Sequence, residues 1–431
     1  MKRKIFSSCL FIIIFSVPYL LTAQTVQDST RNGAVKVYLD CLTCDMNYTR
    51  EQIPYVNYVR DVKEAEVFIL VTYQPTGSKG MEYTYFFNGA YKFAGLNDTL
   101  VYSSGPDETT SVVREKRTNM LKLGLMRYVA RTPLADEISI KHSAKLEKEE
   151  VKDNWNYWVF ELQTSPRYNG EETYKRLMMS NSINISRVTP GMKLEIDLSQ
   201  SYNRQKYIFD GGLTTTYIRT EKEMQGLYVK SLNNHWSAGL KTDVLAATNP
   251  NYDLNVQLMP AIEYDLYPYS EATHRQLRIN YAIGGQFCNY IDSTIYNKVR
   301  ETLYKQELNI AYQVQEKWGS INLSLSGSNY FHDWSKNKLE LNSIVRLRII
   351  KGLSLSVNGG VGYINDQLNL RKGNLTEAER LLRLKEQATS FSVNAGFSVT
   401  YTFGSIYNNV VNPRFGNGMG MGNMMMGGFD R

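Results

Sequence analysis

The stretch NAGFSVTYTF, residues 394–403, alternates strictly between apolar side chains and small or polar ones. Its apolar positions are Ala395, Phe397, Val399, Tyr401 and Phe403. Side chains of a β-strand point to opposite faces with a period of two, so the stretch predicts a strand with one apolar face. The chain as a whole has a mean hydropathy of -0.38, so an apolar strand near its end needs an explanation from the residues that precede it.

Strands of the same kind recur from residue 154 onward, separated by turn signals. We predict about twelve strands, near 154–168, 174–189, 192–207, 213–232, 235–248, 252–269, 275–290, 299–318, 320–332, 337–351, 353–368 and 382–403. Several alternate strictly between apolar and polar residues, as in 192–199 and 277–284. The fourth strand is the weakest because RTEKEMQG (219–226) interrupts the alternation, and we expect a bulge there.

The connections between these strands alternate between tight turns and longer polar segments. The tight turns are VTPGM (188–192), SLNNHW (231–236), YSEATH (269–274), EKWGS (316–320) and IKGLS (350–354), and the longest of the other connections spans 365–384. Short turns on one side and long loops on the other are typical of bacterial outer-membrane β-barrels, whose short turns face the periplasm.

The tryptophans follow the same scheme. Trp155, Trp158, Trp236 and Trp318 fall at the short-turn ends of their strands, and Trp334 falls in a long loop. A ring of aromatic side chains is expected at the membrane boundary of such a barrel.

NAGFSVTYTF resembles the C-terminal assembly signal of Gram-negative outer-membrane β-barrels. The residues that carry the resemblance are the polar Asn394, then Gly396, the hydrophobic and aromatic Val399 and Tyr401, and the final aromatic Phe403. The resemblance implies an outer-membrane barrel inserted by the barrel-assembly machinery. It differs from the usual pattern in position, because residues 404–431 follow the signal. We expect this stretch to be the closing strand, paired with the strand near Tyr157 and facing lipid.

The N-terminus has the pattern of a secretory signal spanning residues 1–23. Three basic residues, 2–4, precede the apolar LFIIIFSVPYLL (10–21), and Ala23 offers a cleavage site. No later run of 18 or more apolar residues occurs, which excludes helical membrane spans. The chain has 49 basic and 42 acidic residues; without the three basic residues of the signal the balance is 46 to 42, too mild to indicate a nucleic-acid partner.

Residues 24–145 predict a small α/β domain in the order β-α-β-β-β-α, with its helices on one face of the sheet. The strands are expected at 34–40, 65–73, 81–95 and 99–105, and the helices at 49–61 and 111–131. Thr49 and Gln52 have the spacing of a capping box at the start of the first helix. The run AEVFILVTY (65–73) suits a strand that is covered on both faces. A charged hinge, 146–153, connects this domain to the barrel region, 154–403.

Cys41 and Cys44 form a Cys-x-x-Cys motif between the first strand and the first helix. A helix N-terminus beside the motif would lower the thiol pKa and favour redox chemistry. The helix is expected to begin several residues later, however, and two thiols alone are too few for a zinc site. In the oxidising periplasm a local structural disulfide is the preferred interpretation, with redox chemistry as the alternative.

If the apolar faces of the strands point to lipid, a set of charged side chains points into the barrel. These lumen-facing charges are Lys193, Glu195, Asp197, Arg278, Glu307, Arg346 and Arg348. They could line a narrow hydrophilic pathway, or they could pair with one another and fill a lumen that has little space to spare. Both interpretations stay open at this stage.

No nucleotide-binding, dinucleotide-binding or zinc-protease motif is present, and the four histidines are scattered, so we predict no enzymatic activity, no cofactor and no metal site. The Gly/Met-rich end of the extension 404–431 has no His or Cys beside its methionines and predicts a disordered tail.

The predicted protein is thus an antiparallel transmembrane β-barrel of about twelve strands, preceded by a periplasmic α/β domain that docks an unknown envelope partner. The expected localisation is the outer membrane, with outer-membrane lipid around the barrel and with the N-terminal domain and the C-terminus in the periplasm. The alternatives are a passive channel for small polar solutes or ions, and a periplasmic thiol–disulfide module on a barrel anchor.

Overall fold

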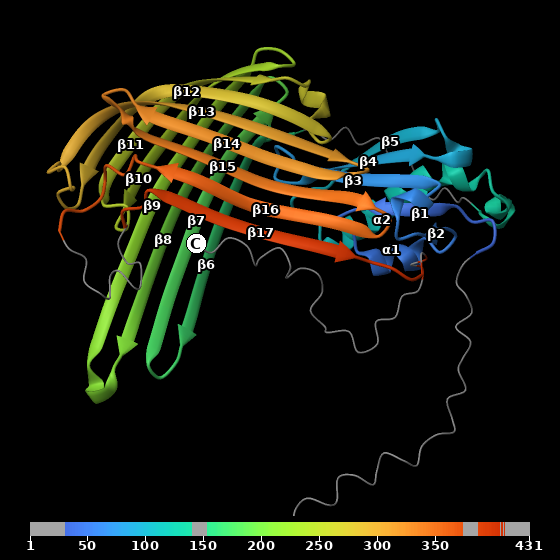
Figure 1. Ribbon diagram of the computed structural model, residues 1–431, viewed down its shortest axis with the longest axis horizontal. Coiled ribbons are helices and arrows are strands. Elements are labelled where there is room, and N and C mark those ends of the chain that lie inside the picture. The colour runs from blue at the N-terminus through green and yellow to red at the C-terminus, as the bar shows by residue number, and fades with distance from the viewer. Residues whose placement is uncertain (1–30, 140–152, 374–386, 406, 408, 410–431) are drawn as a thin grey trace, which may run out of the picture.

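The computed structural model describes residues 31–139, 153–373, 387–405, 407 and 409. The expectations for the signal 1–23, for the hinge residues 146–152 and for the Gly/Met-rich tail lie outside these residues. The described chain forms a five-stranded sheet with two helices, followed by a large twelve-stranded sheet (Figure 1).

The small N-terminal sheet has the order β2-β1-β3-β4-β5. Its strands are β1 (Lys36–Asp40), β2 (Asn57–Tyr58), β3 (Val67–Pro75), β4 (Met81–Gly89) and β5 (Asn97–Ser103), and its helices are α1 (Met46–Gln52) and α2 (Thr110–Val129). Strand β1 pairs in parallel with β2 and β3, and the β3-β4 and β4-β5 pairs are antiparallel. The predicted order is confirmed, apart from the additional two-residue strand β2.

The predicted first helix, 49–61, is wrong in both boundaries. Helix α1 starts three residues earlier, because the Asp45 side chain accepts a hydrogen bond from the backbone N–H of Tyr48 and caps the helix. Thr49, the expected cap, lies inside the helix and donates its hydroxyl to the Asp45 carbonyl at 2.8 Å. The helix ends at Gln52 because Pro54 forces the residue before it out of the helical region.

The core of this domain lies between one face of the small sheet and the helices. Its fully buried side chains include Val35, Val37, Ile69, Tyr85, Phe87, Leu121, Leu125 and Tyr128. Gly124 lets α2 approach the sheet, because a Cβ at this position would lie 2.1 Å from the Phe87 ring. None of the described helices is long and apolar enough to cross a membrane.

The large sheet is an antiparallel meander in which every strand pairs with its neighbours in sequence. Its strands are β6 (Trp158–Gly170), β7 (Tyr174–Thr189), β8 (Met192–Ile208), β9 (Thr214–Ser231), β10 (Trp236–Ala247), β11 (Tyr252–Asp265), β12 (Arg275–Tyr290), β13 (Arg300–Glu316), β14 (Gly319–Tyr330), β15 (Asp333–Ile350), β16 (Leu353–Ile364) and β17 (Phe391–Tyr401). The prediction of twelve strands is confirmed, and most boundaries agree within a few residues.

The bulge expected at 219–226 is absent. Strand β9 keeps one continuous register with both β8 and β10 through this stretch. The stretch has polar side chains on both faces, so its apolar alternation is lost while its strand geometry is kept. Register shifts occur instead near strand ends, for example between Leu245 and Ala247.

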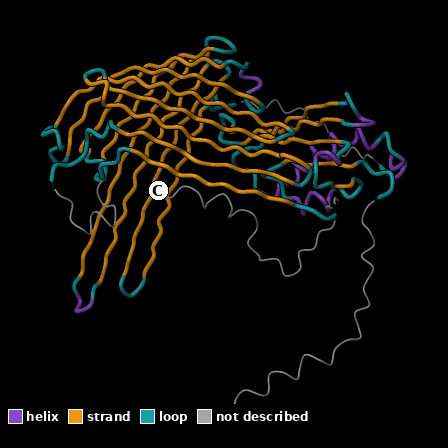
Figure 2. Tube along the Cα trace, in the orientation of Figure 1, coloured by secondary structure: helices purple, strands orange, loops and turns teal. Residues whose placement is uncertain are grey.

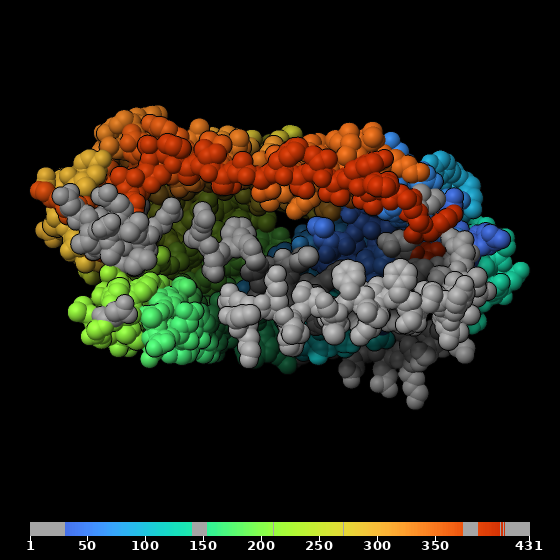
Figure 3. All heavy atoms as spheres, turned by 60° about the horizontal axis from the view of Figure 1, so that its bottom comes forward, coloured from blue at the N-terminus to red at the C-terminus, as the bar shows by residue number. Residues whose placement is uncertain are grey.

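The large sheet curls strongly, so that its two edge strands, β6 and β17, border the same open side (Figures 1 and 3). Figure 3 looks into the recess between them. Among the residues that the structure describes, β17 pairs with β16 alone, so the expected pairing of β17 with the strand near Tyr157 is not formed. Asn156 and Tyr157 both have positive φ angles, so the chain turns at Tyr157 and β6 starts only at Trp158.

The two faces of the large sheet differ in chemistry. On the face that we call the outer face, large apolar side chains are exposed on every strand except β8, among them Leu162, Ile183, Met224, Leu240, Leu258, Ile279, Leu308, Leu323, Leu341, Val361 and Phe397. The opposite, inner face bears most of the polar and charged residues and includes side chains that are almost fully buried, such as Asn255, Met259, Ala282 and Gln286.

The connections lie at two ends of the large sheet. The near end, beside the small sheet, holds 190–191, 232–235, 266–274, 317–318 and 351–352; the far end holds 171–173, 209–213, 248–251, 291–299, 331–332 and 365–390. The expected asymmetry in loop length is only partial, since 266–274 is as long as 291–299 and 331–332 is as short as the tight turns. Trp334 accordingly lies in β15 and not in a long loop.

Candidate functional site

Both faces of the small sheet are buried. The helices of the N-terminal domain cover one face, and the near end of the large sheet covers the other. Phe68, Leu70, Thr72 and Thr84 lie on the face that points away from the helices, yet they are only 3%, 2%, 3% and 7% exposed. This face lies against the near end of the large sheet (Figure 1). The continuous apolar run of β3 is therefore explained by two covers, the helices and the near-end turns.

Aromatic rings of the small sheet contact Lys317, Arg348 and His274 at the near end of the large sheet. The Lys317 ammonium lies 5.5 Å from the centre of the Phe68 ring, and the Arg348 guanidinium lies 5.4 Å from that of Tyr38. The Phe86 and His274 rings are 5.5 Å apart. Cation–π contacts of this length are attractive, and they become stronger where water is excluded.

Acidic residues of the N-terminal domain form the polar part of the same contact. The Arg348 guanidinium donates to the Asp40 carboxylate at 2.7 Å, and the Gly352 backbone N–H donates to the Asp61 carboxylate at 2.7 Å. Lys351 forms an ion pair with Glu64. Charge-assisted hydrogen bonds of this kind are stronger than neutral ones and fix the orientation of the two surfaces.

The segment after β17 continues onto the small sheet. Arg60 donates to the carbonyls of Phe403 and Gly404 at 3.1 and 3.2 Å, and Val59 forms a β-bridge with Tyr407. The described residues of the extension 404–431 lie along the edge of the small sheet, because β2 leaves backbone groups there that can pair with an additional strand.

The hairpin between β3 and β4 makes a third contact, near the start of β6. A Cβ on Gly77 would lie 2.4 Å from the Val188 side chain, so only glycine allows this close approach. Lys79, two residues further on, forms an ion pair with Glu161 at 3.7 Å. The small sheet thus touches the large sheet both at its first strands and at its last ones.

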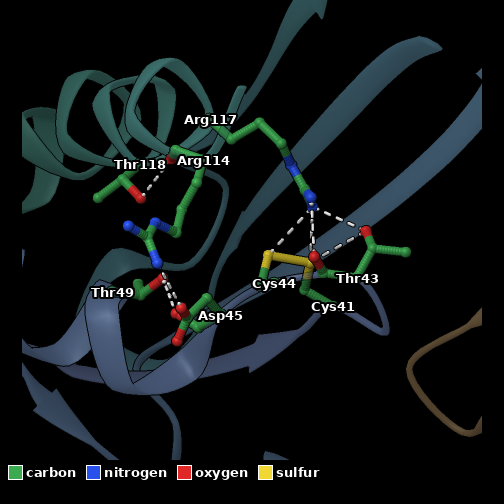
Figure 4. The surroundings of a disulfide bond; sticks show 8 residues. All are labelled: Cys41, Thr43, Cys44, Asp45, Thr49, Arg114, Arg117 and Thr118. Carbon is green, nitrogen blue, oxygen red and sulfur yellow. Dashed lines mark hydrogen bonds and ion pairs between the residues drawn. A yellow bond between two sulfur atoms is a disulfide. The ribbon is translucent and has the colours of Figure 1, made fainter. Parts of the chain in front are cut away.

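Cys41 and Cys44 are joined by a disulfide directly before α1 (Figure 4). The helix begins two residues after Cys44, and the expectation that it starts later is wrong for the reason given above for Asp45. Arg117, from α2, donates to the Thr43 carbonyl at 2.8 Å, and its guanidinium lies 3.2 and 3.3 Å from the two sulfur atoms. Arg117 is only 8% exposed, so it attaches the disulfide loop firmly to the domain core.

The disulfide loop borders the contact between the two sheets. Asp40, which precedes Cys41, pairs with Arg348, and a cavity of about 290 Å³ beside this pair is lined by Leu42 and Arg346. Burial at this place raises the pKa of the Tyr38 hydroxyl, and the neighbouring Arg348 partly counteracts the rise. Of the seven predicted lumen charges, Arg346 and Arg348 therefore lie at the domain contact.

The other predicted lumen charges lie on the inner face, mostly with partners. Lys193 pairs with Glu195 at 3.0 Å, Glu307 pairs with Lys305 at 2.9 Å, and Asp197 accepts a hydrogen bond from Asn184. They do not form one cluster.

Lys193 and Arg278 share a hollow of about 530 Å³, which Lys241 and Glu263 also line. Sequence reasoning missed Lys241 and Glu263, although both occupy inner positions of the alternation in their strands.

The far end of the inner face is covered by residues 365–373 of the last connection. Leu368 is buried against Cys288, Tyr290, Leu303 and Tyr330.

Beside this cluster, the Asn251 amide donates to the carbonyls of Asp292 and Asn369, and Arg371 forms an ion pair with Asp292 at 2.7 Å. The sequence gives little indication that this segment covers the inner face, because DQLNL (366–370) has the composition of an ordinary polar connection.

The residues of the assembly-signal resemblance divide between the two faces of β17. Val399 and Tyr401 are exposed on the outer face, and Phe403 stacks on Tyr401 with ring centres 5.6 Å apart. Asn394 and Gly396 lie on the inner face, where the Asn358 side chain covers Gly396 so closely that a Cβ would lie 2.6 Å from its amide oxygen.

Among the described residues, no group of three or more His, Cys, Asp or Glu side chains is placed to hold a metal ion. The features with the strongest geometry are therefore the contact between the two sheets and the polar inner face behind it. Comparison with models of known protein families and with curated proteins finds no match for this chain.

Proposed function

We propose that this protein is a non-enzymatic outer-membrane β-barrel whose polar interior forms a passage for small polar solutes or ions, kept closed by its own N-terminal domain. In this proposal the near end and the N-terminal domain lie in the periplasm, and the far end faces outward. The single observation that carries the closing role is the buried second face of the small sheet, which lies on the near-end turns.

The exposed apolar outer face supports the membrane location. Soluble proteins rarely expose apolar patches of more than a few hundred Å², and here large apolar side chains are exposed on all strands of the large sheet except β8. Strand β17 carries apolar outer residues from Phe391 to Tyr401. At 3.4 Å per residue and a tilt of about 40°, this length spans roughly 26 Å, close to the apolar band of such barrels.

Closure of the barrel requires β6 and β17 to pair. Each of these two strands has one edge that pairs with no other strand in the described part of the chain, and they run in opposite directions relative to the near end. Unpaired backbone groups in a lipid interior cost several kcal/mol each, so insertion into a bilayer favours antiparallel pairing of the two edges.

The closed state depends on contacts that can be broken. Besides the apolar burial of its second face, the small sheet is held by charge pairs and ring contacts, and both the Lys351 and the Glu64 side chains are partly exposed. Exposed ion pairs contribute little stability, typically about 0–1 kcal/mol each. The inner-face hollow that Lys241 and Arg278 line is formed by residues of the large sheet and its turns, so displacement of the domain would leave this hollow intact.

Conductance of the full chain in planar bilayers tests this proposal. Wild-type protein should conduct rarely, and Asp40→Lys with Glu64→Lys should conduct more often, because both changes repel cations of the near end. Adding Arg348→Glu and Lys351→Glu restores complementary charges and should restore closure. Absence of conductance in every variant, or a fourfold variant as open as the double one, would contradict the proposal.

The second candidate is docking of an envelope partner on the N-terminal domain. It is favoured by the helical face of that domain, which the large sheet leaves uncovered and on which Leu123 of α2 is 64% exposed. A photo-crosslinker at Leu123 should give a discrete product in the cell envelope, and one at the exposed Glu115 of the same helix should not. Equal labelling at the two positions would count against a specific partner.

A further inference from the structure

The far ends of β6–β9 extend beyond the neighbouring strands as two long hairpins (Figures 1 and 2). Three cations gather on the outer face of these hairpins, and we call Lys175, Arg204 and Lys206 the basic cluster. Lys175 and Lys206 are direct cross-strand partners on β7 and β8. Arg204 precedes Lys206 by two residues and so lies on the same face.

The outer position of the basic cluster follows from the register. Ile183 is exposed on the outer face, and its cross-strand partner Leu198 points to the same face. Every second residue of β8 beyond Leu198 also points to this face. This alternation places Arg204 and Lys206 outside. The acidic residues of the neighbouring strand β9, Glu221 and Glu223, occupy inner positions instead, since they alternate with the outward Met224.

The basic cluster forms no ion pairs with the acidic side chains that the structure describes. The inner-face cation Arg219, by contrast, pairs with Glu221 at 3.5 Å. Directly opposed like charges destabilise a strand pair. Their presence at Lys175 and Lys206 therefore points to an external anion.

The distance from the near end places the cluster at a lipid boundary. A tilted strand crosses the hydrocarbon core in about 9–11 residues. Counted from the near-end turn before Met192, this length on β8 ends close to Tyr202, just before Arg204 and Lys206. The opposite Cβ atoms of Lys175 and Lys206 are roughly 5 Å apart, and Arg204 lies roughly 7 Å along the strand, so one phosphate can reach all three side chains.

We propose that the basic cluster binds the phosphate groups of anionic lipids in the leaflet at the far end. This inference rests on the proposed membrane location of the large sheet. The arginine supplies paired N–H donors for phosphate oxygens, and the two lysines supply compact charges on flexible stems. The site selects lipids by headgroup charge and not by their acyl chains.

Lipid binding by the full chain tests the proposal. Wild-type protein, the triple variant K175Q/R204Q/K206Q and the matched control R167Q/R176Q/R219Q are inserted into vesicles of phosphatidylcholine containing phosphatidic acid. The control removes three cations from inner positions of the same hairpins. Native mass spectrometry then measures the ratio of phosphatidic acid to phosphatidylcholine retained by each protein, and heat-modifiable migration measures insertion.

The triple variant should insert normally and lose its preference for phosphatidic acid by about tenfold, while the control keeps it. An unchanged preference in the inserted triple variant, or an equal loss in the control, would overturn the lipid site and leave the barrel intact. Failure of wild-type protein to insert would overturn both proposals. If millimolar inorganic phosphate abolishes the preference, the site takes free phosphate and the lipid assignment is wrong.

Discussion

Arg117 shows how one side chain holds several parts of the N-terminal domain together. It contacts the Thr43 carbonyl and both cysteine sulfurs, and its guanidinium lies 4.2 Å from the centre of the Tyr83 ring. Arg117→Ala should lower the free energy of unfolding by about 2–3 kcal/mol, because a buried charged donor is lost and its acceptors are left unpaired. Thermal unfolding of the full chain followed by circular dichroism measures the change.

Arg114→Ala is the matched control for this prediction. Arg114 lies on the same helix, but its ion pair with Asp45 is largely exposed, so the cost should stay below about 1 kcal/mol. Equal effects of the two substitutions would show that Arg117 acts as a surface charge.

Gly124 is required for the distance between α2 and the sheet. Gly124→Ala should destabilise the domain by about 1–3 kcal/mol, because the new methyl group collides with the Phe87 ring and outweighs the helix propensity gained. Adding Phe87→Leu should recover part of the loss in the same unfolding experiment. A stabilised single variant would contradict the close contact.

The disulfide between Cys41 and Cys44 should remain oxidised in growing cells, because its loop places Asp40 and Asp45 and is held by a buried arginine. Alkylation of whole cells with a mass-tagged maleimide measures free thiols. Buried Cys288 serves as the internal reference, since it should react only after denaturation. Tagging of Cys41 or Cys44 in native cells would favour the thiol–disulfide alternative instead.

At the scale of elements, the tyrosines around α1 and β2 make the small sheet sensitive to alkali. Burial raises the pKa of Tyr55 to about 12 and also raises the pKa of Tyr58. A raised folded-state pKa means that the stabilisation is complete below about pH 10 and is lost as the pH rises through about 12. Far-UV circular dichroism and absorbance at the tyrosinate band should therefore change together above about pH 10.

Tyr55→Phe removes one of these titrating groups and should move the alkaline transition of the domain upward. A transition at unchanged pH in this variant would show that Tyr55 ionises without affecting the fold.

Strands were more predictable than helices in this chain. A period of two repeated over many residues located all twelve strands of the large sheet, since each one has to keep its apolar residues on one face. Helix α1 is too short to show a helical period, and its start depends on one capping contact from Asp45. The polar stretch 219–226 of β9 was expected to contain a bulge, because it lacks the apolar alternation. It nevertheless pairs with β8 and β10 in one continuous register.

At the scale of the whole molecule, a charged side chain should destabilise the large sheet when it is placed on the outer face and should be tolerated on the inner face. Leu258→Lys places a cation on the outer face, where Leu258 is 50% exposed, and should cost about 2–4 kcal/mol in a bilayer. Gln257→Lys, one residue earlier and on the inner face, should be tolerated. Guanidinium unfolding in lipid vesicles, with heat-modifiable migration as the folding check, compares the two, and equal costs would contradict a lipid-facing outer surface.

The sequence by itself determined the strand pattern, the two chemically different faces, the small α/β domain and the cysteine pair, because each of these follows from neighbouring residues along the chain. Only the tertiary structure decided that the small sheet lies on the near-end turns, that Arg348 pairs with Asp40, and that residues 365–373 cover the far end. These contacts join residues that are tens to hundreds of positions apart, and no local period or spacing encodes which side chains meet. Tertiary structure also decided the pairing of the apolar strand β17, which pairs with β16 on one edge and with no described strand on the other.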